Sequence, residues 1–104
     1  MKAAIRIEPS PLYGDSYLRY LKVRPSIKNK IKTFIEYKCQ VPPLSLGAHD
    51  YALSGDLAGF MHCHLSGNIL LVYVLDHSVL KLIMVCNHDE LYKISTKIKK
   101  YANR

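Results

Sequence analysis

This 104-residue chain has no tryptophan, five glycines, three cysteines and few acidic side chains. The cysteines, Cys39, Cys63 and Cys86, are odd in number and show no paired spacing, which argues against a disulfide framework and favours a reducing compartment. No apolar run approaches the ~20 residues that a membrane-spanning helix needs. The first residues also lack the apolar segment of a signal peptide. We therefore expect a cytoplasmic protein with no membrane association.

Positive charge is what the chain has in excess. Fifteen lysines and arginines outnumber eight acidic residues, which gives a net charge of +7. Hydrophobic residues make up 49% of the chain, as in a folded protein, and the length predicts one domain over residues 1–104. The positive charge favours a polyanionic partner, either a nucleic acid or an acidic protein.

The first part of the chain predicts one strand followed by two helices. Alternating apolar and polar residues predict the strand, and the helices follow residue types that favour helix caps. The predicted elements are a strand over Ala3–Glu8, a helix capped by Asp15–Ser16 and running to Leu21, and a helix capped by Ser26 and ending before Val41. The apolar face of the second helix consists of Ile27, Ile31, Phe34 and Ile35.

The second part predicts a sheet and a final helix. The predicted elements are a loop over Leu44–Asp56, strands over Leu57–Leu65, Ile69–Leu75 and Val79–Cys86, and a helix over Asp89–Tyr101 that opens at Asn87 or His88. The order β-α-α-β-β-β-α predicts an α+β fold in which the two N-terminal helices pack on a twisted antiparallel sheet.

Three of the five histidines, His62, His64 and His88, bracket the predicted strands. Because side chains alternate along a strand, Phe60, His62 and His64 share one face, which we expect to point away from the core. The opposite face, expected to pack under the helices, takes Met61, Cys63 and Leu65. Histidine transfers protons near neutral pH, so the pattern favours a binding or catalytic face. Solvated histidines without a role, or a zinc site, are the alternatives.

Several short motifs follow one another in a fixed order along the second half of the chain. They comprise Asp50, Leu53 and Gly55; Gly59, Phe60, Cys63 and His64; Ile69 to Tyr73; and His88, Leu91 and Tyr92. In this order and spacing the chain resembles the YafQ-like branch of the RelE superfamily, which are toxins of type II toxin–antitoxin modules. The resemblance is best over residues 50–92.

The resemblance implies a RelE-like fold and a ribosome-dependent endoribonuclease that cleaves messenger RNA without a cofactor or metal. It implies mRNA, the ribosome and a cognate antitoxin as partners, the last in a heteromeric complex. By position, His64 and His88 match the family's catalytic histidines, and Tyr92 matches its C-terminal active-site aromatic residue. Asp50 matches an acidic position of the family. The other substrate-binding candidates are His62 and Asn68, where the family often has acidic residues, and Lys81.

On this interpretation His64 and His88 are the acid/base pair that cleaves RNA at a 2′-OH, with the direction of proton transfer open. The chain departs from the family at Met61 and Met84, where arginine is usual and would stabilise charge on phosphorus. Lys81 is a candidate replacement for that charge. The alternative is a weakened RelE-like domain that binds RNA, the ribosome or an antitoxin without cleaving.

Overall fold

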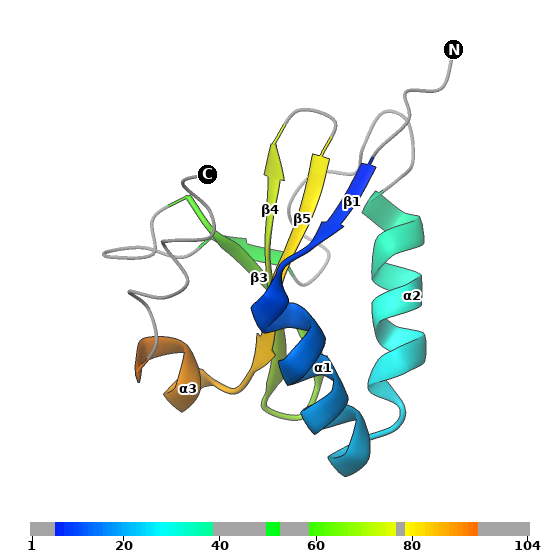
Figure 1. Ribbon diagram of the computed structural model, residues 1–104, viewed down its shortest axis with the longest axis vertical. Helices are drawn as coiled ribbons and strands as arrows, with labels where there is room; N and C mark the ends of the chain where they lie inside the picture. The colour runs from blue at the N-terminus through cyan, green and yellow to red at the C-terminus, as the bar shows by residue number, and fades with distance from the viewer. Residues whose placement is uncertain (1–5, 39–49, 53–58, 77–78, 94–104) are drawn as a thin grey trace.

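A computed structural model describes residues 6–38, 50–52, 59–76 and 79–93 (Figure 1). The elements are strand β1 (Arg6–Pro9), helix α1 (Pro11–Val23), helix α2 (Ile27–Lys38), and strands β2 (Asp50–Ala52), β3 (Met61–Ser66), β4 (Ile69–Asp76) and β5 (Val79–Cys86), then helix α3 (His88–Lys93). The predicted α+β class and the predicted order of the elements are confirmed, with β2 as an additional strand.

The five strands form one sheet in the order β1-β5-β4-β3-β2. Strands β2 to β5 run antiparallel to their neighbours, whereas β1 runs parallel to β5 with Ile7 opposite Leu80. The prediction of a wholly antiparallel sheet is therefore wrong at this edge. No hairpin joins β1 to β5, because both helices and three strands lie between them in the chain, so turn geometry does not impose an antiparallel direction.

Helix α1 begins four residues before its predicted cap. The side chain of Ser10 accepts a hydrogen bond from the Tyr13 backbone N–H at 3.1 Å, and Pro11 occupies the first helical position. Proline suits that position because its missing N–H is unused there. Ser16, the predicted cap, lies instead in the middle of the helix and is buried.

Two further boundaries differ from the prediction. The segment predicted as a loop contains β2, whose three residues are too few to show alternation. Strand β3 begins at Met61 rather than Leu57, after a turn at Gly59 with a positive φ of 98°. The predicted parts that lie outside the described residues are Ala3–Ile5, Val41–Pro43, residues 44–49 and 53–58, His77, Ser78 and Ile94–Tyr101.

Each face of the sheet has its own buried apolar cluster. Helices α1 and α2 cover one face (Figure 1), and α3 contributes Leu91 to the other. The helix-side core consists of Ile27, Ile31, Phe34, Cys63, Leu65, Ile69, Leu71, Tyr73, Leu80, Leu82 and Val85. The second core consists of Phe60, Leu70, Val72, Ile83, Met84, Cys86 and Leu91. The predicted packing of Met61, Cys63 and Leu65 toward the helices is confirmed.

A β-bulge in β5 changes which face its last residues occupy. Val72 of β4 pairs with Met84, but the next residue, Tyr73, pairs with Leu82, so Ile83 is the extra residue. Ile83 and Met84 consequently both enter the second core. Because side chains alternate with a period of two, one extra residue reverses the face of every residue after it. The bulge therefore turns Cys86, and the chain that enters α3, toward the second core.

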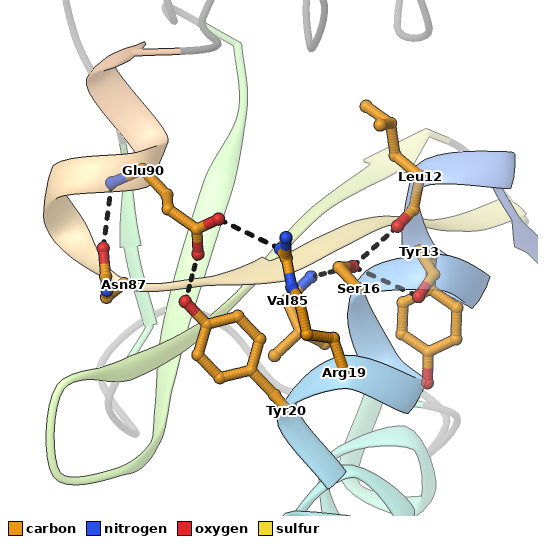
Figure 2. A network of polar contacts seen from close by, with 8 residues as sticks. All are labelled: Leu12, Tyr13, Ser16, Arg19, Tyr20, Val85, Asn87 and Glu90. Atoms are coloured by element: carbon orange, nitrogen blue, oxygen red, sulfur yellow. Dashed lines mark hydrogen bonds and ion pairs between the residues drawn. The ribbon is translucent and has the colours of Figure 1, made fainter. Parts of the chain in front are cut away.

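Two serines connect α1 to the outer edge of β5 where β1 ends. The Ser10 backbone N–H donates to the Leu82 carbonyl at 2.8 Å, and the Ser10 hydroxyl donates to the Ile83 carbonyl. Further along, the Ser16 hydroxyl oxygen accepts a hydrogen bond from the Val85 N–H at 2.9 Å (Figure 2). The serines thus satisfy backbone groups that a neighbouring strand would otherwise pair, and they fix α1 against β5.

Replacing Ser16 by alanine tests this connection. The variant leaves the buried Val85 N–H without its acceptor, so we expect a loss of about 1–3 kcal/mol in the free energy of unfolding. Urea denaturation followed by circular dichroism measures the loss. Thr33→Ala, at an exposed position of α2, is the control and should change stability by less than about 0.5 kcal/mol. Equal stability of the two variants would contradict the proposed connection.

Candidate active site

The site begins with two histidines on β3. His62 pairs with Val72 of β4, and His64 pairs with Leu70. Both partners belong to the second core, so alternation places both imidazoles on that side of the sheet, away from α1 and α2. This confirms that the two histidines share a face.

His88 joins them from the first position of α3. The ring centroids lie 5.7 Å apart for His62 and His64, 6.0 Å for His62 and His88, and 5.9 Å for His64 and His88. We call these three residues the histidine triangle. Its members are separated by up to 26 positions in the chain, and the hairpin β3–β4, strand β5 and the bulge bring them together.

The triangle has one buried and two exposed members. His62 is only 8% exposed, whereas His64 and His88 are exposed. We expected this face to be open, but Phe60 is only 3% exposed and the second core lies beside the histidines. The expectation of an open face is wrong because β4 and β5 also place apolar side chains on the histidine side of the sheet, where they form the second core. The His64 and His88 rings are therefore accessible from solvent, while the His62 ring is largely shielded from it.

The other predicted site residues are spread around the triangle. Asp50 is in register with Cys63, and Tyr51 is the residue in register with His62. Asn68 is exposed in the β3–β4 turn. Strand geometry puts the Cα of Lys81 about 12 Å from that of His62, on the same face, at the opposite end of β5 from His88. The backbone of Tyr92 lies in α3, and its side chain lies outside the described part of the structure.

The two positions where the resemblance led us to look for arginine are not on the exposed site. Met84 is 1% exposed within the second core, in the strand row that contains His62 and Val72. Met61 is half-buried and packs against the helix-side core. The surface beside the histidines therefore contains no guanidinium from either position.

A polar network beside the triangle was missed by the sequence analysis. The Glu90 carboxylate accepts hydrogen bonds from the Tyr20 hydroxyl and, at 3.0 Å, from the Arg19 guanidinium (Figure 2). The Asn87 side chain accepts a bond from the Glu90 N–H at 2.9 Å, which caps α3. Asn at the cap and Glu three residues later is a common helix-start pattern, but nothing local identifies the partners on α1.

Burial and the network alter the acidity of two nearby groups. Burial and the hydrogen bond to Glu90 raise the pKa of Tyr20 from 10.0 to about 12. Burial, and secondarily the Glu90 charge, raise the pKa of the Cys86 thiol from 9.0 to about 12. Both groups are therefore neutral at physiological pH, and the Cys86 thiol is a packing group rather than a nucleophile.

Among the described residues, no group of three histidine, cysteine or acidic side chains has an arrangement that could hold a metal ion. Over the same part of the chain, no helix has both the length and the apolar character needed to cross a bilayer.

The fold and the motif order place the protein among the RelE-like toxins. A metal-bound toxin from Helicobacter pylori is 27% identical, with a TM-score of 0.69, and covers 84% of this chain and 98% of its own. The toxin in the Escherichia coli DinJ–YafQ toxin–antitoxin complex is 24% identical with a TM-score of 0.69, and the match covers 86% of this chain and 99% of that one. A YoeB/ParE toxin from Agrobacterium tumefaciens is 22% identical with a TM-score of 0.66, and the match covers 81% of this chain and 99% of that one. No curated protein sequence matches the chain significantly.

The family model of the bacterial toxin YafQ, of type II toxin–antitoxin systems, matches residues 6–93. The chain therefore belongs to the YafQ family of type II toxins, which confirms the resemblance found in the sequence.

Alkaline titration tests the Tyr20–Glu90 contact. The folded-state pKa of Tyr20 exceeds 10.0, so the protonated phenol contributes stability that is complete below pH 10.0 and is lost toward about pH 12. In Tyr20→Phe this contribution is absent at every pH. We expect the stability difference between wild type and Tyr20→Phe, from urea unfolding, to be smaller at about pH 11 than at about pH 9. A difference that stays constant would contradict the contact.

Proposed function

We propose that this protein is a cytoplasmic, ribosome-dependent mRNA endoribonuclease, the toxin of a type II toxin–antitoxin pair. The observation that carries the proposal is the pair of exposed imidazoles of His64 and His88, whose centroids lie 5.9 Å apart beside the buried ring of His62. Two imidazoles at this separation can contact a single phosphodiester from both sides.

The reaction needs only these two groups for its proton transfers. The neutral imidazole accepts the proton of a ribose 2′-OH while the 2′ oxygen attacks the adjacent phosphorus. The bond from phosphorus to the 5′ oxygen breaks, and the protonated imidazole donates its proton to that oxygen. The products are a 2′,3′-cyclic phosphate and a free 5′-OH. A well-placed acid or base contributes ~10²–10⁴-fold each, and no cofactor enters the proton balance.

The surrounding residues take supporting roles in this proposal. His62 contacts the phosphate or serves as a reserve base. Tyr92 stacks against an unpaired base, as aromatic side chains do in RNA complexes. The contacts to the rest of the substrate are assigned to Asp50, Asn68 and Lys81.

Charge on the helices supports an RNA-bearing partner. Lys28, Lys30 and Lys32 are exposed on α2, and the chain carries a net charge of +7. Exposed lysines bind phosphates with an affinity that falls as salt rises. We propose that they contact ribosomal RNA and mRNA while the histidine triangle acts on one phosphodiester.

A protein partner follows from the family. The similar toxin of Escherichia coli is known in a DinJ–YafQ toxin–antitoxin complex. We propose that a cognate antitoxin likewise binds this chain in a heteromeric complex. Co-expression of a cognate antitoxin should then abolish the toxicity of this protein.

A second candidate function rests on the buried Met84. If the missing guanidinium is essential for charge stabilisation at phosphorus, the domain binds the ribosome, RNA or antitoxin without cutting. The two functions differ in one observable, which is the appearance of new mRNA 5′ ends.

Cleavage in a purified translation system decides between them. We expect the wild-type protein to cut a translated mRNA at sites mapped by primer extension, and to leave the same RNA intact without ribosomes. His64→Ala and His88→Ala should each reduce the rate by at least ~10²-fold, because each removes one proton-transfer group.

His77→Ala serves as the matched control, since the proposed reaction does not use His77. Wild-type rates and undiminished growth arrest for both active-site variants would eliminate the histidine mechanism. Ribosome binding by a wild-type protein that never cuts would favour the second candidate function.

A further inference from the structure

Helix α3 begins at His88. In its described part, His88, Asp89 and Lys93 are exposed, and Leu91 is fully buried in the second core. Contacts from its first turn to other elements help to fix the direction in which His88 points.

Glu90 supplies those contacts. Its two carboxylate oxygens accept from different donors, Tyr20 and Arg19, which are adjacent on α1 (Figure 2). Its backbone N–H donates to Asn87 at the end of β5. We call the contacts of Glu90 with Arg19 and Tyr20 the Glu90 bridge.

The Glu90 bridge closes a ring of contacts that begins and ends at β5. Strand β5 binds α1 through Ser16 and Val85 at 2.9 Å, α1 binds Glu90, and Glu90 returns to β5 through Asn87. In the chain, His88 lies between Asn87 and Glu90, the two residues joined by the last of these contacts. Its position is thus set from both sides, by the cap of α3 and by the bridge.

The bridge is poorly suited to a purely stabilising role. The Arg19 side chain is 59% exposed and that of Glu90 is 30% exposed, and exposed ion pairs contribute little to folding. A displacement of a reacting group by about 1 Å, in contrast, can cost ~10²-fold in rate. Besides the stability that the Tyr20 contact contributes, losing the bridge is therefore expected to change the geometry of the site.

We propose that Glu90, held by Tyr20 and Arg19, is a positioning residue that keeps the His88 imidazole beside His64 and His62. This inference rests on the proposed nuclease function, to which it adds three residues that do not touch the substrate. Through the bridge, the helix layer on one face of the sheet controls the active site on the other face.

The first experiment measures position without activity. In the wild-type protein we expect nuclear Overhauser contacts between the ring protons of His88 and those of His64 or His62, given centroid distances of 5.9 and 6.0 Å. Glu90→Ala should lose them while the circular dichroism spectrum keeps the wild-type shape, which shows that the fold is intact. Glu90→Gln, which can still accept from Tyr20, should retain part of them.

Glu8→Gln is the matched control. Glu8 forms an ion pair with Arg6 at 2.8 Å on β1, so this variant also loses an exposed charge pair but leaves α3 untouched. It should keep every contact between the histidine rings. Retention of those contacts in Glu90→Ala, or their loss in Glu8→Gln, would overturn the proposal.

The second experiment uses mRNA cleavage. We expect Glu90→Ala to lower kcat by roughly 10–100-fold with KM changed by less than about threefold, and to have no further effect in the His88→Ala background. Additive losses in the double variant would contradict action through His88. If the wild-type protein cuts no mRNA, the proposed function fails, and the ring contacts alone still decide whether Glu90 positions His88.

Discussion

The arrangement of the site depends on one extra residue in β5. Leu80 and Leu82 face the helices, and without the bulge at Ile83 the later even-numbered residues would face them too. The bulge reverses this alternation, so that Met84 and Cys86 enter the second core and the chain reaches α3 on the histidine side. The packing of Leu91, the network of Glu90 and the meeting of His88 with β3 all require that reversal.

The bulged part of β5 also connects the helix-covered face of the sheet with the histidine side. Ser10 and Ser16 of α1 bind the edge of β5 that β1 leaves unpaired, and the next turns of α1 present Arg19 and Tyr20 to Glu90. The polar contacts of α1 therefore extend from the bulged edge of the strand to the first turn of α3. The site thus draws on three elements: β3 provides His62 and His64, α3 provides His88 and Glu90, and α1 provides the partners of Glu90.

The sequence predicts the helices and strands better than the tertiary contacts between them. Strand alternation alone placed His62 and His64 on one face, and apolar periodicity located α2, β4 and β5 closely. A bulge leaves no mark in a strand that is apolar on both faces, so the sequence predicted that His88 lies near the other histidines but not how β5 brings it there. The partners of Glu90 lie 70 and 71 positions away, on a helix whose true cap, Ser10, stands between two prolines. Long-range contacts of this kind carry no local signal.

The pH dependence of single-turnover mRNA cleavage on the ribosome tests the central claim most directly. If two imidazoles share the proton transfers, the rate measured from about pH 5 to about pH 8 should follow a bell-shaped curve, because one ring must be neutral while the other is protonated. His88→Gln should remove one limb and leave a single slope. A wild-type rate that does not vary across this range, or a bell that persists in His88→Gln, would contradict acid/base catalysis by this pair.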